Sequence, residues 1–366
     1  MPTLHPTTPA ADGYRMPAEF EPHAGCWMLW PTRPDVWRNN TAPARHAFAE
    51  VATAIARFEP VTVGVNRDDY AEARATLPDA VRVVELSSDD AWMRDCGPTF
   101  VVNNAGNMRA VDWVFNAWGG ELDGLYADWT QDDLVASKVA EIERADRYRA
   151  PIVVEGGAIH VDGEGTLITT SSCLLNPNRN PGRSRTEMTD LLCAYTGAEK
   201  VIWLDFEAFE ETDGHVDGVC AFVRPGVMVV DWTDDPDTPE YAACRAAWAQ
   251  LEAATDARGR SFELHKLHAA TPPPLTSDEA RGIQPMDGSY PRRAGEPIGG
   301  TYCNFYIANG GVVVPTYDHP RDAEALATLA RLFPDHEIVG VPAREIAIGG
   351  GMVHCITQQV PLAKRG

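Results

Sequence analysis

The sequence predicts an α/β fold in which repeated modules surround a pseudo-symmetry axis. The first observation is a β-hairpin pattern, two short apolar strands joined by a glycine turn, that occurs four times. The second is that a helical pattern follows each hairpin and further strands follow the helices. A single hairpin is too small to bury its own apolar face, so we expect the modules to pack radially. The four turn glycines are Gly106, Gly165, Gly226 and Gly310.

Ahead of the repeats, strands and helices alternate. Residues 1–20 are rich in Pro, Thr and Ala and predict a flexible N-terminal arm, with order beginning near Pro22. Thr41 is expected to cap a helix whose apolar residues recur three and four positions apart. Apolar runs predict strands at 25–30, 61–65 and 81–86, with a short helix over 69–77.

Each repeat adds a helix to its hairpin. The helical patterns cover 132–145, 184–195, 239–254 and 321–333, and strands are expected at 201–204 and 337–339. The turn glycines are separated by 59, 61 and 84 residues. The longest interval contains a proline-rich stretch at 271–274 and a further loop at 281–299, which together predict a lid or a substrate-facing loop.

Composition limits the classes of partner. The 366 residues include 53 Asp or Glu and 31 Lys or Arg, a formal net charge of −22. This charge argues against nucleic acid or an anionic membrane surface and favours a cationic small molecule, although it could serve solubility alone. We see no leader pattern, no apolar run of about 18 residues, and no paired or zinc-like spacing among the eight cysteines. We therefore expect reduced thiols and a cytoplasmic protein.

Polar residues occupy one position in successive modules. Asp95, Glu155 and His215 each lie ten or eleven residues before their turn glycine, and Gly299 holds this position in the fourth module. If the modules surround an axis, the three side chains converge near its centre. A single Asp, Glu or His is more often a turn or core residue, but a shared register makes that reading less plausible.

The end of the chain carries a thiol that can meet them. Three glycines at 349–351 allow close backbone approach and lead into a β-branched segment that contains Cys355. If that segment is a strand, His354 and Cys355 point to opposite faces, so His354 is a poor candidate for the thiol's base. His215 is then the candidate acid and base, and Asp217 can orient its imidazole or face the substrate.

Three carboxylates around one thiol restrict the chemistry. Asp95, Glu155 and Asp217 would raise the pKa of Cys355 and suppress its thiolate unless the substrate brought positive charge. A planar guanidinium supplies that charge, pairs with carboxylates and offers an electrophilic carbon. We infer attack of Cys355 on this carbon, loss of ammonia with a proton from His215, and hydrolysis of the amidino-thioester by water that His215 activates.

A metal site is the alternative for the same residues. His215, Asp217 and Glu155 could ligate a cation, yet the sequence offers no His-Glu-x-x-His motif and no paired histidine ligands. We therefore expect no metal.

Motifs with specific spacing run from about Met16 to Pro361. They are the segments 92–99, 116–120, 155–165, 174–181, 214–217, 304–311 and 354–359. In these segments the sequence resembles the agmatine deiminase family, which belongs with the bacterial peptidylarginine deiminases to the guanidine-modifying pentein superfamily. The resemblance implies a five-bladed α/β propeller, a single catalytic domain over 21–366, no cofactor, and hydrolysis of agmatine to N-carbamoylputrescine and ammonia.

Family analogy points to a homodimer or larger homo-oligomer.

The resemblance also implies roles for single residues. Trp92, which opens the first motif, is expected to contact the substrate. The remaining matches are Cys355 to the nucleophile, His215 to the acid and base, and Asp95, Glu155 and Asp217 to the carboxylates that bind the guanidinium.

Five positions depart from the residues usual in the family. Met352, Asp213 and Gly218 each stand where the family usually has an Asn, and Gly299 and Gly300 stand where it usually has two alanines. We expect these residues to line the pocket for the distal end of the substrate, where less bulk and an added charge would change substrate preference. The expected function is deimination of agmatine or of another guanidino compound. An amidinotransferase and a guanidine-binding protein without activity are the alternatives.

Overall fold

Four β-sheets repeat one module, an antiparallel hairpin, a helix and a strand parallel to the hairpin's second strand. The computed structural model describes residues 2–207 and 211–363. The helices before the last strands are α5 (Val135–Glu143), α7 (Arg185–Thr196), α8 (Glu240–Ala253) and α10 (Arg321–Leu332). The strands are β5 (Thr99–Asn103), β6 (Met108–Val114) and β7 (Asp146–Val153), β8 (Ile159–Val161), β9 (Thr166–Thr170) and β10 (Lys200–Leu204), β11 (Cys220–Arg224), β12 (Val227–Trp232) and β13 (Glu263–His268), and β14 (Tyr306–Ala308), β15 (Gly311–Thr316) and β16 (Glu337–Pro342).

The glycine turns of the four hairpins are confirmed. Gly106, Gly165, Gly226 and Gly310 have φ of 85°, 106°, 78° and 78°, which is the left-handed region that other residues enter at a cost. The helix starts are also encoded locally. The Ser184 hydroxyl accepts a hydrogen bond from the Glu187 amide, and the Glu187 carboxylate accepts one from the Ser184 amide, which completes a capping box.

The fifth sheet joins the two ends of the chain. Its order is β17 (Gln358–Pro361), β2 (His23–Leu29), β3 (Val61–Val65) and β4 (Arg82–Glu85). Strand β17 runs antiparallel to β2, and the other two pairings are parallel, so this sheet has the pattern of the four modules. Helices α1 (Ala42–Ile55) and α2 (Tyr70–Thr76) connect its strands. The pairing brings the segment after Cys355 against the start of the chain.

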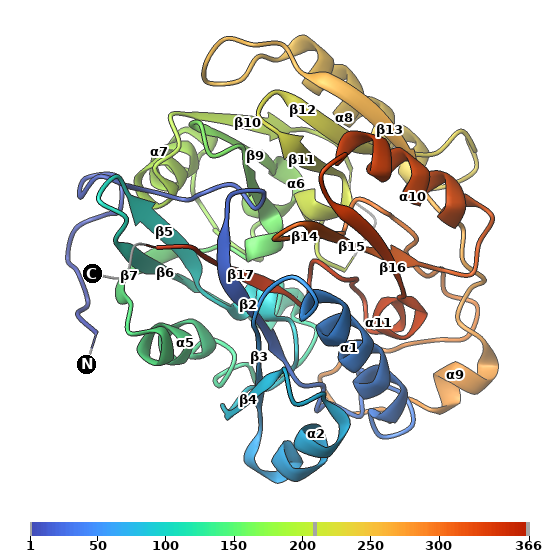
Figure 1. Cartoon of the computed structure of the whole chain (residues 1–366). Coiled ribbons are helices and arrows are strands. Elements are labelled where there is room, and N and C mark those ends of the chain that lie inside the picture. The colour runs from blue at the N-terminus through green and yellow to red at the C-terminus, as the bar shows by residue number, and fades with distance from the viewer. Residues whose placement is uncertain (1, 208–210, 364–366) are drawn as a thin grey trace.

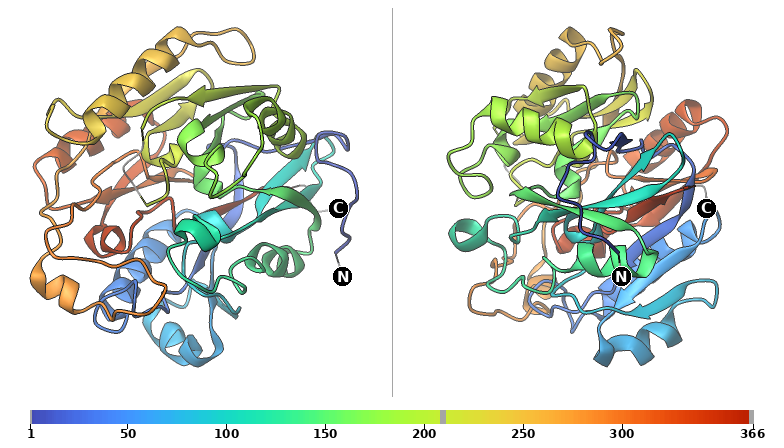
Figure 2. Two further views of the ribbon diagram at one scale, coloured as in Figure 1. Left: turned by 180° about the vertical axis from the view of Figure 1, so that it is seen from behind. Right: turned by 90° about the vertical axis from the view of Figure 1, so that its left-hand side faces the viewer.

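Sheets lie toward the middle of the molecule and helices toward its outside (Figures 1 and 2). The short strands β14, β11 and β17 are central in Figure 1, whereas α2, α5, α7, α8 and α10 lie at the periphery. The long interval between the third and fourth modules contains α9 (Ser277–Arg281), whose Glu279 pairs with Arg344 at 2.8 Å. Within the described ranges, no helix is both long and apolar enough to cross a membrane.

Two local predictions are wrong. Thr41 does precede α1, but its φ is 71° and its hydroxyl donates to the Asn40 carbonyl, so its side chain caps no helical amide. Residues 353–356 form a turn between α11 (Arg344–Ile348) and β17, so Cys355 does not lie on a strand. The three preceding glycines and this turn break the alternation that the expectation for His354 relied on.

The first twenty residues differ from the expectation of a loosely held arm. Strand β1 (Tyr14–Arg15) pairs antiparallel with β5, and Leu4 forms a bridge with Arg147. Ala18 and Glu19 are buried, with 1% and 6% of their surface exposed. The Pro-, Thr- and Ala-rich composition of this segment did not predict that Glu19 is buried, because its burial depends on charged partners from distant parts of the chain.

Candidate active site

Four short segments bring the five predicted catalytic residues together. Asp95 lies in the one-turn helix α3 (Met93–Cys96), and Glu155 and His215 immediately precede short 3-10 turns. Asp217 lies inside the second of these turns, and Cys355 lies in the turn before β17. All five side chains are buried. The shared register of the modules therefore predicted a real spatial cluster.

Gly157 marks the centre of this cluster. A Cβ atom added to it would lie 2.6 Å from His215 Nδ1 and 3.0 Å from both Asp95 Oδ1 and Asp217 Oδ2. Its amide donates to Asp95 Oδ1 at 3.0 Å. Three catalytic candidates thus face the position that a side chain at residue 157 would occupy, and glycine keeps that position open.

His215 lies between two carboxylates. Its Nδ1 is 3.8 Å from Asp95 Oδ1 and its Nε2 is 3.7 Å from Glu155 Oε2, yet neither buried ring nitrogen has a hydrogen-bond partner. Burial alone would lower the pKa of His215, but the charge of Asp95 and the neighbouring Glu155 raise it well above its usual value. The imidazolium form is favoured, so His215 is prepared to donate a proton.

The carboxylates of Glu155 and Asp95 have different environments. Burial favours the neutral form of both, but the Arg179 guanidinium, whose Nε donates to Glu155 at 2.5 Å, brings the pKa of Glu155 to about 2. Asp95 accepts a hydrogen bond from Trp118 Nε1 at 2.9 Å, and burial raises its pKa to about 6 against the charge of His215. Glu155 is therefore held ionised, whereas Asp95 can titrate near neutral pH.

The thiol of Cys355 has acidic neighbours. Its Sγ lies 3.4 Å from Asn304 Oδ1 and 3.8 Å from Asp217 Oδ2. Burial first, and then the charges of Asp217 and Asp95, raise the pKa of Cys355 well above its usual value. Without a cation nearby the group stays a thiol, as the sequence argument predicts.

His354 has a role that the sequence argument missed. Its Nδ1 contacts Asp217 Oδ2 at 2.7 Å and its Nε2 contacts Glu19 Oε2 at 2.8 Å. Arg94 Nη2 also donates to Glu19 Oε2, at 3.3 Å. Burial would raise the pKa of Glu19, but the charges of His354 and Arg94 lower it. His354 thus connects the N-terminal segment to Asp217, beside the thiol.

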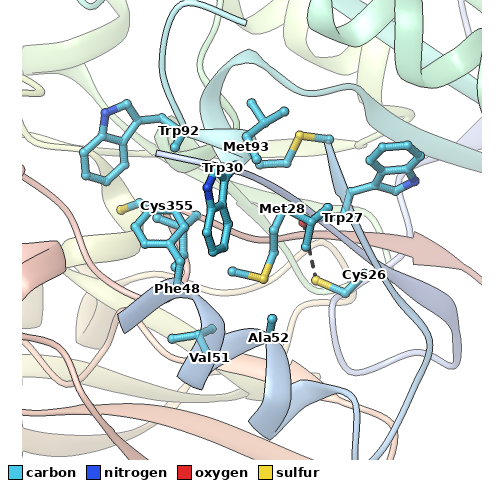
Figure 3. Close-up of a cluster of buried hydrophobic side chains, with 14 of the residues drawn as sticks. Cys26, Trp27, Met28, Trp30, Phe48, Val51, Ala52, Trp92, Met93 and Cys355 are labelled. Carbon is cyan, nitrogen blue, oxygen red and sulfur yellow. Dashed lines mark hydrogen bonds between the residues drawn. The ribbon is translucent and has the colours of Figure 1, made fainter. Parts of the chain in front are cut away.

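Trp92 borders the thiol. A Cβ atom added to Gly351 would lie 2.4 Å from the Trp92 ring and 3.1 Å from the Cys355 Cβ. Figure 3 shows Cys355 and Trp92 at one side of the apolar cluster that also contains Trp30 and Phe48. Trp92 and Trp118 meet edge to face at 6.3 Å and line a small cavity with Tyr126 and other residues. The aromatic rings of Trp92, Trp118 and Tyr126 therefore lie on the Cys355 side of the catalytic residues.

The five positions expected to form a distal pocket have other surroundings. A Cβ atom at Gly299 would lie 2.7 Å from the Met352 methyl group, so the long side chain fills the space that the glycine leaves. A Cβ atom at Gly300 would lie 2.3 Å from the Ala270 carbonyl oxygen, and Gly218 ends a 3-10 turn. Asp213 pairs with Arg179 at 2.8 Å. Trp92, also an expected substrate-binding residue, lies next to Cys355 and lines the small cavity.

The described residues include one group with the composition of a metal site. Glu155, Cys173 and His215 each offer a ligand atom, and these atoms lie within 4.8 Å of one another. The Cys173 thiol donates to Glu155 Oε2 over 3.9 Å. This group differs from the His215, Asp217 and Glu155 set that the sequence suggested.

Comparison with known proteins identifies the family. The model of the family described as Porphyromonas-type peptidyl-arginine deiminase matches residues 15–361. The chain belongs to this family. It is 55% identical over 362 residues to an agmatine deiminase of Pseudomonas aeruginosa, covering 98% of each chain, and 54% identical over 358 residues to that of Stutzerimonas stutzeri, covering 97% of each. The solved agmatine deiminase of Enterococcus faecalis matches with a TM-score of 0.97 at 45% identity over 99% of this chain and all of that one. The chain thus has the α/β fold of this pentein enzyme.

Several site residues of this family member were inside the motifs but had no assigned role. Trp118, Arg179 and Asn304 all lie in segments that carry the resemblance, and each contacts a predicted catalytic residue. A buried Arg beside a required carboxylate is a signal that could have been used, because such a carboxylate needs a charged partner. Glu19 gave no comparable signal.

Proposed function

We propose that this enzyme is an agmatine deiminase that converts agmatine and water to N-carbamoylputrescine and ammonia. The observation that carries the proposal is the convergence of His215, Asp95 and Asp217 on the open position at Gly157. Cys355 lies next to Asp217, and Glu155 lies next to His215. The relatives called agmatine deiminases, at 55% and 54% identity over nearly the whole chain, support agmatine as the substrate.

Binding would place the guanidinium between Asp95 and Asp217, near Cys355. Two carboxylates that face one position can each accept N–H donors from a planar cation. The cation offsets the negative charges that raise the pKa of Cys355, so substrate binding itself favours the thiolate. The site is thereby inactive toward other electrophiles until a guanidinium enters.

In the first half of the reaction, the Cys355 thiolate attacks the guanidino carbon and a C–S bond forms. The electron pair of the C=N bond moves to nitrogen. His215 donates its proton to one terminal nitrogen, the C–N bond breaks, and ammonia leaves an amidino group on sulfur. The imidazolium form that the surrounding carboxylates favour fits this step.

In the second half, water replaces ammonia. The neutral His215 accepts a proton from water as the oxygen attacks the amidino carbon. The C–S bond then breaks, and its electron pair and the hydroxyl proton go to the sulfur as the neutral ureido product leaves. This restores the thiol, whose own proton went to solvent when the substrate bound. No cofactor takes part in the proposed cycle.

The surrounding residues are proposed to hold this geometry. Arg179 keeps Glu155 ionised beside His215. His354 and Glu19 orient Asp217, and Asn304 accepts from the thiol and from the backbone amides of His354 and Cys355. Electrostatic catalysis of this kind depends on groups that are already aligned before the reaction.

The test is ammonia release by the purified protein with agmatine, arginine, peptidyl-arginine and longer or substituted guanidinoalkyl amines, with Cys355→Ser as control. We expect agmatine to be preferred and the control to be inactive, because the Met352 and Gly299 pair fills space rather than opening it. Preference for another guanidine would favour the altered pocket. Amidino transfer to an added amine, or binding without turnover, would favour the remaining alternatives.

We also propose an architecture and an assembly for this enzyme. We propose that the five sheets form a five-bladed propeller with one module per blade, and that the N-terminal segment belongs to the single catalytic domain. The five sheets with a common strand pattern support the first statement. A cytoplasmic homodimer or larger homo-oligomer remains a prediction from the sequence.

A further inference from the structure

Cys173 is a buried thiol that the proposed reaction does not use. It lies in α6 (Ser171–Leu174), and none of its surface is exposed. Its Sγ is 3.9 Å from Glu155 Oε2, which is also 3.7 Å from His215 Nε2. A soft sulfur, an imidazole nitrogen and a carboxylate oxygen therefore meet on the side of His215 away from Asp95.

These distances fit a small tetrahedral cation. Zinc bonds of about 2.3 Å to sulfur and about 2.0 to 2.2 Å to nitrogen or oxygen put the ligand atoms roughly 3.4 to 3.7 Å apart. The two measured separations exceed this range by a few tenths of an ångström at most, and all three atoms lie within 4.8 Å. The third separation, between the sulfur and the imidazole nitrogen, is at most 4.8 Å. Movement of the three side chains toward a shared ion would complete three bonds, leaving a fourth position for water.

The imidazole of His215 gives a second, independent observation in favour of a ligand at this position. Both ring nitrogens of His215 are buried without a hydrogen-bond partner, and 2% of the residue is exposed. A buried polar group of this kind calls for a partner from outside the protein. The guanidinium of the substrate faces Asp95 and Asp217 in the proposed function, which leaves the nitrogen that faces Glu155 unexplained.

The local charge favours a cation. Arg179 approaches Glu155, but it also pairs with Asp213 at 2.8 Å, so its charge is shared between two carboxylates. Arg179 holds Glu155 Oε1, whereas Oε2 faces His215 and Cys173. The Glu155 oxygen that Arg179 does not contact and the His215 nitrogen without a hydrogen-bond partner thus lie on the same side.

We infer that Glu155, Cys173 and His215 form an inhibitory site for a thiophilic divalent cation of the zinc class. On binding, the Cys173 thiol and the His215 imidazolium each release a proton to solvent, and the sulfur, Nε2 and the Glu155 oxygen each donate an electron pair to the metal. The bound ion occupies the lone pair with which His215 would take up a proton. Metal binding is independent of the proposed function, whereas the inhibition rests on it.

The direct test uses Co²⁺ as a spectroscopic substitute for zinc in the Cys355→Ser protein, which lacks the nucleophile. We expect one equivalent to give a sulfur-to-cobalt absorption band and tetrahedral visible bands, both removed by excess Zn²⁺. The bands should disappear in Cys355→Ser/Cys173→Ser and in Cys355→Ser/Cys173→Ala. They should remain in Cys355→Ser/Cys244→Ser, because Cys244 lies in α8 outside the cluster. Circular dichroism and thermal melts establish that each variant is folded.

Activity provides the second readout. Zn²⁺ should inhibit ammonia release by lowering kcat for agmatine, because it blocks proton transfer at His215, and a chelator should reverse the inhibition. Relative to its own metal-free rate, Cys173→Ser should require at least tenfold more Zn²⁺ for half inhibition. A thiolate band that survives loss of Cys173, or no band in folded Cys355→Ser, would overturn the site even if agmatine is hydrolysed. Binding without inhibition would overturn the inhibitory role, and an inactive wild type that still binds cobalt would contradict the proposed function alone.

Discussion

Replacing Asp217 with asparagine should make the thiol of Cys355 more reactive while abolishing deimination. The Asp217 carboxylate lies 3.8 Å from the sulfur. At an effective dielectric constant of about 20, two negative charges at this separation repel by about 4 kcal/mol. Since about 1.4 kcal/mol corresponds to a tenfold change, removing the charge raises the thiolate population at neutral pH by more than tenfold, with roughly a thousandfold as the upper bound. Turnover falls because the variant lacks the Asp217 carboxylate, one of the groups proposed to bind the guanidinium of the substrate.

The assay is the rate of alkylation of Cys355 by iodoacetamide as a function of pH, followed by mass spectrometry of the peptide that contains it. Cys355→Ser gives the background from the other seven cysteines. Asp162→Asn is the matched control, since Asp162 is fully buried but accepts hydrogen bonds in the turn of the β8–β9 hairpin. An Asp217→Asn protein that alkylates within twofold of the wild-type rate across the pH range would refute the proposed suppression of the thiolate.

Three other perturbations test the surrounding site. Arg179→Met should lower the free energy of unfolding by about 3 to 5 kcal/mol, because Glu155 remains buried without its partner; urea titration measures this, and recovery should follow from adding Glu155→Gln. The kcat/KM for agmatine should fall as pH drops through about 6, where Asp95 takes up a proton and loses the charge that binds the guanidinium. Each pH unit changes the ratio of charged to neutral Asp95 about tenfold, so a profile that stays flat down to about pH 5 would argue against that role. Gly157→Ala should reduce kcat/KM by about a hundredfold or more, since its methyl group enters the position that the site keeps open; near-normal turnover would contradict the placement.

Local pattern was sufficient to predict the repeating part of the fold. Glycine turns, short apolar strands and helical periodicity are encoded within each module, and the structure follows them. The similar offsets of Asp95, Glu155 and His215 from their turn glycines, ten or eleven residues, then predicted their convergence without any contact information. The pairing of β17 with β2 was not predicted, because it joins residues from the two ends of the chain.

The surroundings of the site could not be predicted in the same way. Whether Glu19 is a solvated residue or a buried partner of His354 depends on contacts across more than three hundred residues. The expectation that His354 faces away from the site assumed regular strand alternation, which the turn at 353–356 removes. The Gly299 and Met352 exchange predicted a change of pocket shape, and the structure adds that the Met352 methyl group lies 2.7 Å from where a Cβ atom at Gly299 would be. Single substitutions in a sequence do not reveal such paired packing.

The central claim is that Cys355 carries the amidino group during turnover. Acid quenching of the wild-type protein during steady-state reaction with agmatine, followed by peptide mass spectrometry, tests this directly. We predict an adduct on Cys355 with the mass of agmatine less ammonia, which appears within the first turnover and is absent from Cys355→Ser. An active enzyme that shows no adduct at Cys355, or shows one at another residue, would contradict the account.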